Sequence, residues 1–286
     1  MYIPTTLRTL AARAVRHVFV GDELPIAADR DLGDPGLLGP DSVSWRVLAD
    51  PATVTGGVAA LLMQACHPLA LQGVVDHSAY RQDPFGRLRR TVSYVLVTSY
   101  GSKSEARAAA DVVTRRHATV SGLTDRGERY AASDERLMLW IHCALISCIL
   151  ASHRAFGKTA LTAAEADRFV AEQATLVALL GLDAPRSVQE LHDAIGSFRD
   201  ELRHDSHTAD ALEFMTSPPL PARMRVVYKL VLAGATSVLD PDTTKLLGLS
   251  EPSSREVRAS GYLYDAWRAV LPTNAVFQTA LARANH

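Results

Sequence analysis

Lysine and cysteine are both scarce in this sequence of 286 residues. Only 4 of its 30 basic residues are lysines, and the remaining arginines suit carboxylate binding, because a guanidinium can donate two parallel hydrogen bonds. The three cysteines, Cys66, Cys143 and Cys148, stand in apolar surroundings without CxxC spacing. This pattern argues against a disulfide framework or a zinc site and favours buried thiols in a reducing compartment.

An excess of charge and a long apolar run are also missing. The net charge is −1 and the sequence pI about 6.8, so we expect no nucleic-acid partner. The most apolar run, residues 137–151, includes His142 and is too short to span a bilayer. It predicts a central buried helix and no transmembrane segment. Residues 5–20 carry arginines but no secretory signal pattern, which predicts a cytoplasmic protein. This basic amphipathic segment is either a first helix packed on the domain or a peripheral contact with a membrane surface.

Strand patterns and several catalytic motifs are absent as well. We find no sustained period-2 alternation, no G-x-S-x-G elbow, no phosphate loop and no H-E-x-x-H. Helical periodicity recurs instead, so we predict an all-α fold forming one helical domain over residues 1–286. The predicted helices cover residues 5–18, 53–75, 85–99, 104–121, 133–155, 162–180, 187–204, 219–233, 240–248 and 255–270, with a short one after Pro272.

Local signals set several of these boundaries. Thr162 and Glu165 match a capping box at the start of a helix. Pro68 should end or kink a helix near His67. Residues 21–41, rich in Asp, Gly and Pro, predict a surface loop.

One face of the predicted helix 85–99 carries polar side chains. Arg87, Thr91 and Tyr94 follow the i, i+4, i+7 spacing of a helix face, and Arg90 lies beside them. An arginine, a hydroxyl and a phenol in one stripe can bind an anion or orient an oxygen ligand. A solvated helix face with exposed arginines fits the same pattern, which leaves both interpretations open.

His117 stands on the apolar side of the predicted helix 104–121. Ala106, Ala110 and Val113 precede it at helical spacing, and such small residues let a broad, flat molecule lie against a helix. On spacing alone, His117 is either a ligand or a core histidine bonded to a protein group.

Other histidines give weaker signals. His67 precedes Pro68 and marks a helix terminus or a side chain exposed to a pocket. His142 should be buried, neutral and bonded through one ring nitrogen, as a core residue or beside a metal site. Glu201 and His204 have the E-x-x-H spacing of di-iron bundles, but the chain has only one such copy. We interpret it as a solvated helix end.

Three stretches taken together resemble the rubber oxygenase catalytic domain: QACHPLALQGVVDHSAYRQDPFGRLRRTVSY, RRHATVSG and YAASDERLMLWIHCALISC. This family includes the bacterial latex clearing proteins and the fungal oxygenase of mycophenolic acid biosynthesis. The resemblance covers about residues 45–235 and leaves about 236–286 as a helical cover. It implies an all-α, globin-like core around b-type haem, and cleavage of isoprenoid double bonds with dioxygen.

The resemblance also assigns roles to the residues above. It implies that His117 is the proximal haem ligand. Arg87 and Thr91 match the family's R-x-x-x-T pattern on the distal side, with Tyr94 on the same stripe. Arg90 stands where the latex clearing proteins have a lysine, but an arginine cannot serve as a base.

One departure from the family concerns the catalytic base. The rubber oxygenases place a glutamate upstream of the arginine, but this chain has none between Asp50 and Arg87. Of Asp76, His77 and Asp83, we nominate Asp76 and His77 as substitutes. We therefore expect a haem-dependent oxygenase acting with dioxygen on a lipophilic small molecule; the alternative is a non-catalytic helical protein that binds haem or a lipid.

Overall fold

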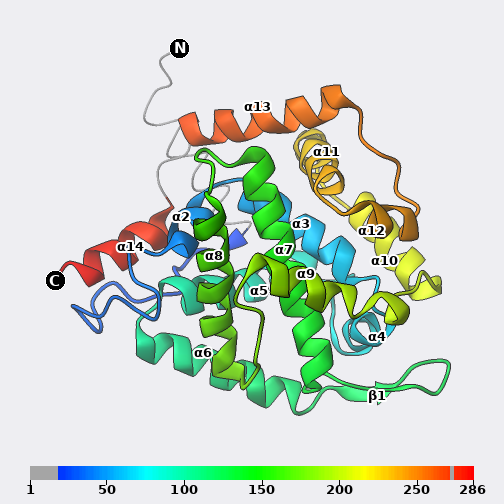
Figure 1. The fold of residues 1–286 in the computed structure, drawn as a ribbon, viewed down its shortest axis with the longest axis horizontal. Coiled ribbons are helices and arrows are strands. Elements are labelled where there is room, and N and C mark those ends of the chain that lie inside the picture. Colours follow the sequence, from blue (N-terminus) through cyan, green and yellow to red (C-terminus); the bar gives the residue numbers. More distant parts are fainter. Residues whose placement is uncertain (1–18, 271–273) are drawn as a thin grey trace.

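The computed structural model describes residues 19–270 and 274–286, which are almost entirely helical (Figure 1). The predicted all-α class is confirmed, since the only strands in this part of the chain have three residues each. The globin-like arrangement stays a prediction, and the helix predicted over residues 5–18 lies outside the described residues. The α-helices are α2 (Val43–Ala49), α3 (Thr53–Gln64), α4 (Pro68–His77), α5 (Pro84–Tyr100), α6 (Lys103–His117), α7 (Glu135–Phe156), α8 (Ala163–Val177), α9 (Val188–Gly196), α10 (Ser206–Thr216), α11 (Ala222–Ser237), α12 (Pro241–Leu246), α13 (Ser254–Val270) and α14 (Ala275–Ala284).

Capping side chains fix where several predicted helices begin. At α8, the Thr162 hydroxyl accepts a hydrogen bond from the Glu165 amide at 3.2 Å, and the Glu165 carboxylate accepts from the Thr162 amide at 2.8 Å. Ser102 and Glu105 form the same capping box at α6. Each box satisfies two amides that the helix leaves unpaired, so the predicted starts of these helices are confirmed.

The single helix predicted over residues 53–75 is two helices, because Pro68 breaks it. His67 has an extended backbone, with φ −93° and ψ 110°, and Pro68 is the first residue of α4. Proline lacks an amide hydrogen and disfavours the helical conformation of the residue before it. The break predicted at His67 is confirmed, and it sends α4 towards the hairpin and α10.

Helix α7 runs through the centre of the fold (Figure 1). Its Trp140 and Cys143 are fully buried, and α3 makes the most extensive helix contact with it. Among the described helices, α7 alone is long and apolar enough to cross a membrane, unless α2 and α3 are joined across their 90° bend. However, 61% of its most apolar window is buried inside the fold, as expected of the central helix predicted here.

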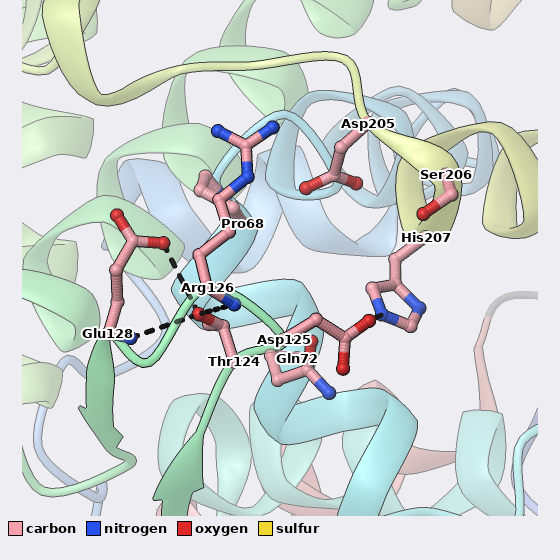
Figure 2. Close-up of a pocket in the computed structure, with 9 residues that line it drawn as sticks. All are labelled: Pro68, Gln72, Thr124, Asp125, Arg126, Glu128, Asp205, Ser206 and His207. Atoms are coloured by element: carbon pink, nitrogen blue, oxygen red, sulfur yellow. Dashed lines mark hydrogen bonds and ion pairs between the residues drawn. The ribbon is translucent and has the colours of Figure 1, made fainter.

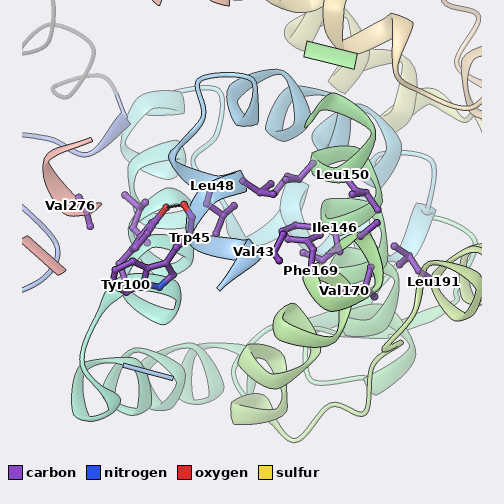
Figure 3. Packing of buried hydrophobic residues seen from close by; sticks show 14 of the residues in the cluster. Val43, Trp45, Leu48, Tyr100, Ile146, Leu150, Phe169, Val170, Leu191 and Val276 are labelled. Atoms are coloured by element: carbon purple, nitrogen blue, oxygen red, sulfur yellow. Dashed lines mark hydrogen bonds between the residues drawn. The ribbon is translucent and has the colours of Figure 1, made fainter. Parts of the chain in front are cut away.

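The main apolar cluster joins α2, α5, α7 and α8 (Figure 3). Trp45 of α2 donates its indole hydrogen to the Ser99 carbonyl at 2.7 Å, and Tyr100 donates to the Trp45 carbonyl at 2.9 Å. Phe169 of α8 is fully buried in the same cluster as Ile146 of α7. These contacts hold α5, α7 and α8 in fixed positions around the pocket described below.

The C-terminal helices cover two sides of this core. α13 packs on α11, which packs on α3, while α14 packs against α5 (Figure 1). Arg283 of α14 is buried and donates to the Tyr100 carbonyl at 2.7 Å and the Asp34 carbonyl at 2.9 Å. It also faces the Glu105 carboxylate at 3.6 Å. The end of the chain is therefore held by a buried charge as well as by apolar packing.

Several short elements differ from the sequence prediction. The helix predicted over residues 104–121 ends at His117, and a hairpin follows it, formed by β1 (Ser121–Leu123) and β2 (Arg129–Ala131). Gly127 closes the hairpin turn with φ +78°, a conformation that favours glycine. The predicted helix 187–204 is only α9 and a 3₁₀ turn, Arg199–Glu201, and neither α2 nor α10 was predicted.

Candidate functional site

The polar face predicted on α5 exists, and two of its side chains have no partner. The guanidinium of Arg87 is half-buried and makes no hydrogen bond or ion pair within the described chain. Burial lowers its pKa from the ordinary value and raises that of the Tyr94 hydroxyl to about 12. The Tyr94 hydroxyl is likewise unpaired in the part of the chain that the structure covers. A half-buried cation and a phenol without protein partners are available to a ligand.

The other two α5 residues face solvent. Thr91 is exposed and donates its hydroxyl hydrogen to the Arg87 carbonyl at 3.2 Å. Arg90 is also exposed and lies 3.7 Å from the carboxylate of Asp83. An exposed ion pair of this kind contributes at most about 1 kcal/mol. The structure therefore places both residues at the outer edge of the α5 face, and their roles stay predictions.

His117 is the last residue of α6 and is half-buried. Its ring makes no hydrogen bond or ion pair with any described residue. Burial lowers the pKa of the imidazole below its usual 6.5, so the ring is neutral at pH 7. Ala110 and Ala106, about two and three turns earlier, are buried. The structure therefore shows no protein partner for this ring, and its role as a ligand stays a prediction.

The two nominated bases are held together by a tyrosine that sequence reasoning missed. The Tyr130 hydroxyl donates to the Asp76 carboxylate at 2.5 Å, and His77 Nε2 lies 3.1 Å from the Tyr130 hydroxyl oxygen. Burial and the neighbouring carboxylate raise the pKa of Tyr130 to about 12. Gly122 faces Tyr130 across the hairpin, where a Cβ would stand 2.5 Å from the hydroxyl. Asp76 and His77 thus come together, but each already has a protein partner.

A small apolar pocket opens between α5, α7 and α8, and we call it the α5–α7 pocket. It has a volume of about 60 Å³ and is lined by Tyr94 and Ser99, by His142, and by apolar side chains such as Leu145 and Leu176. His142 is buried as predicted, but Nε2 has no hydrogen-bond partner in the described chain, contrary to the prediction that one ring nitrogen would be bonded. Burial lowers the pKa of His142 to about 4.

This lowered pKa predicts a specific loss of stability in mild acid. The unfolded imidazole takes up a proton below its usual pKa of 6.5, whereas the folded one does so only near 4. Stability is therefore lost as the pH falls through this window, by about 2 kcal/mol between pH 7 and pH 5. Urea unfolding at pH 7 and pH 5 measures this loss. Between these pH values, the free energy of unfolding of His142→Leu should fall by about 2 kcal/mol less than that of the parent. His192→Leu, at an exposed histidine, should lose as much as the parent; equal losses in all three proteins would contradict the assignment.

A larger pocket of about 200 Å³ lies between α4, the hairpin and α10 (Figure 2). Three carboxylates line it, those of Asp125, Glu128 and Asp205, and His207 Nε2 lies 3.3 Å from Asp125. None of the residues predicted from the sequence as site residues line it. Its acidic, open lining does not suit a lipophilic ligand, so size alone does not make it the better candidate.

The rival metal site does not form. Glu201 accepts a hydrogen bond from Arg136 Nε at 2.6 Å and lies 3.2 Å from His67 Nε2, while His204 Nδ1 lies 2.9 Å from the Leu246 carbonyl. No group of three or more His, Cys, Asp or Glu side chains suited to a metal ion occurs among the described residues. Haem does not need such a group, because one imidazole can hold its iron.

The side chains present fit haem better than the available space does. An unpaired neutral imidazole at His117 suits iron, and an unpaired guanidinium at Arg87 suits a propionate carboxylate. The α5–α7 pocket, by contrast, holds only about 60 Å³ and is lined by neither of these residues. It is also smaller than the roughly 300–1,000 Å³ of most cofactor sites.

A family model described as "ER-bound oxygenase mpaB/B'/Rubber oxygenase, catalytic domain" matches residues 45–273. The chain belongs to this family. The rubber oxygenase resemblance is thereby confirmed, and the family domain extends to residue 273, beyond the boundary near 235 set from the sequence. As a member of the mpaB and rubber oxygenase family, the chain is assigned to an oxygenase class, and the domain contains every candidate site residue named above. Comparison with curated proteins and with solved structures gave no significant match.

Proposed function

We propose that this chain is a haem b-dependent oxygenase that acts with dioxygen on a lipophilic small molecule of the isoprenoid class. The observation that carries the proposal is the His117 imidazole, which is half-buried and unpaired in the described chain and whose pKa is lowered by burial. A neutral imidazole is a common axial ligand of haem iron. Membership of an oxygenase family supports the reaction class.

Each side chain of the α5 face has a role in this proposal. Arg87 binds a haem propionate with its guanidinium, because a carboxylate satisfies its unpaired donors. Tyr94 supplies a hydroxyl at the mouth of the α5–α7 pocket. Arg90 and Thr91 contribute charge and a hydroxyl at the solvent edge. When bound, haem supplies the centre at which dioxygen binds and is activated.

Haem binding requires more space than the α5–α7 pocket provides. This pocket is several times smaller than a typical cofactor site. Neither His117 nor Arg87 lines it, so we propose that haem is held outside this pocket, against α5 and α6.

Proton removal from the substrate falls to Asp76 and His77. The Tyr130 hydroxyl bridges the two groups, so the carboxylate and the imidazole are held side by side as proton acceptors. Both side chains are exposed at the end of α4. They replace the glutamate that this chain lacks.

Product formation tests the proposal. The reduced, haem-loaded protein is mixed with oxygen and farnesol, an oxygenated isoprenoid, and carbonyl products are trapped and identified by mass spectrometry. We expect carbonyl products from the parent and from His192→Ala, an exposed control, and only background from His117→Ala. A stable oxygen complex that forms no product would contradict the oxygenase.

That outcome would favour the second candidate, a non-catalytic protein that binds haem or a lipid. The specific observation for it is that Asp76 and His77 already share the Tyr130 hydroxyl. Replacing Tyr130 with phenylalanine separates the two functions, because it frees His77 and leaves Asp76 with only the hydrogen bond that it accepts from Gln72. A carrier should bind haem as before, whereas an oxygenase that depends on this pair should change its rate.

A further inference from the structure

Two buried polar atoms without partners lie in the wall of one pocket. His142 Nε2 and Ser99 Oγ both lack a hydrogen-bond partner in the described chain, and both residues line the α5–α7 pocket. His142 is 9% exposed and Ser99 is fully buried. Buried polar side chains are nearly always paired, so these two atoms indicate a group that the pocket receives.

Two other polar side chains around the pocket are already engaged. Thr98 donates its hydroxyl hydrogen to the Tyr94 carbonyl at 2.9 Å, and the Gln173 amide donates to the Ser44 hydroxyl at 2.9 Å. The Tyr94 hydroxyl is also unpaired, but Tyr94 is only half-buried, so His142 and Ser99 are the buried groups without a partner in the pocket wall. The rest of the wall is apolar, with Val95 on α5 and Ile149 on α7.

These properties define the occupant. A volume of about 60 Å³ admits a group of only a few heavy atoms. A purely apolar group would leave both polar atoms unpaired, which is unfavourable in a buried site. A neutral imidazole and a hydroxyl can each donate or accept, so a carbonyl or hydroxyl oxygen satisfies them without a charge.

We propose that the α5–α7 pocket binds a short apolar group bearing a carbonyl or hydroxyl oxygen, which hydrogen-bonds to His142 Nε2 and Ser99 Oγ. Taking this group to be the end of the substrate rests on the proposed function. The substrate is then an oxygenated lipid rather than a pure hydrocarbon, and His142 is a specificity-determining residue. The preference of the pocket for oxygen does not depend on haem.

Acetone and isobutene test this preference, because they have nearly the same shape and differ in one oxygen. Each is titrated into the full chain labelled with ¹⁵N-histidine and with ¹³C in the isoleucine methyl groups, and followed by NMR. The methyl signals of Ile146 and Ile149, which line the pocket, report the affinity for both molecules in every variant. Acetone should shift the His142 Nε2 signal of the parent, and isobutene should not. In His142→Leu the ratio of acetone to isobutene affinity should fall about five- to tenfold, the effect expected of one lost hydrogen bond. His142→Gln, which keeps an amide donor, should recover part of the ratio.

The exposed control His192→Leu should leave this ratio unchanged. An unmoved His142 signal in the parent with acetone, or an equal ratio in His142→Leu, would overturn the inference and leave a buried water as the partner of both atoms. The product assay and this titration separate the two proposals. If the parent forms carbonyl products but does not prefer acetone to isobutene, only this inference is wrong. If the parent prefers acetone but forms no product, this inference is supported and only the oxygenase proposal is wrong.

Discussion

Replacing Arg283 with methionine is expected to lower the free energy of unfolding by about 3–5 kcal/mol, the usual result of breaking a buried ion pair. Its side chain is almost completely buried and joins α14 to the Tyr100 and Asp34 carbonyls and to Glu105. Methionine keeps much of the apolar stem but donates no hydrogen bond. The two carbonyls lose their partner, and the Glu105 carboxylate loses the nearest buried cation.

Urea unfolding monitored by circular dichroism measures this loss. Arg258→Met is the matched control, because Arg258 is exposed on α13, and it should change stability by less than about 0.5 kcal/mol. An equally small change in Arg283→Met would mean that the C-terminal helix contributes little to the fold.

Replacing each of two adjacent glycines in α3 with alanine is expected to change the stability of the protein in opposite directions. A Cβ on Gly56 would lie 2.6 Å from the Ile149 Cα of α7, whereas one on Gly57 meets no atom within 4 Å. Gly56→Ala therefore forces α3 and α7 apart and should cost about 2–3 kcal/mol. Gly57→Ala gains helix propensity and should stabilise by up to about 1 kcal/mol.

Thermal and urea unfolding of the two variants check this difference. The two substitutions add the same methyl group to the same helix, so the change in chain composition cancels between them. A loss at both positions, or at neither, would show that the close crossing of α3 and α7 does not limit the packing.

Long elements were predictable from the sequence, whereas short ones depend on distant residues. The pattern of α5 and α7 and the capping box of α8 lie within each segment. Helix α2 has only seven residues, and the amides of Val43 and Ser44 at its start donate to Glu172 of α8 at 3.2 and 2.8 Å. Nothing near α2 in the sequence reveals this partner, so α2 was missed.

The candidate site divides in the same way. The shared face of Arg87, Thr91 and Tyr94 follows from helical spacing alone. The pairing of Asp76 and His77 through Tyr130 does not, because Tyr130 lies on the hairpin more than fifty residues later in the chain. The unpaired Nε2 of His142 could not be predicted either, because it depends on the absence of a hydrogen-bond partner on α5, α7 and α8 around the pocket.

Titration of the purified full chain with haem, followed by visible absorption, tests the central claim most directly. We predict a Soret band that saturates at one haem per chain, and that His117→Ala abolishes or shifts it while His142→Leu and the exposed His192→Ala leave it in place. A spectrum unchanged in His117→Ala but altered in His142→Leu would contradict the account, because the iron would then be held by the other imidazole.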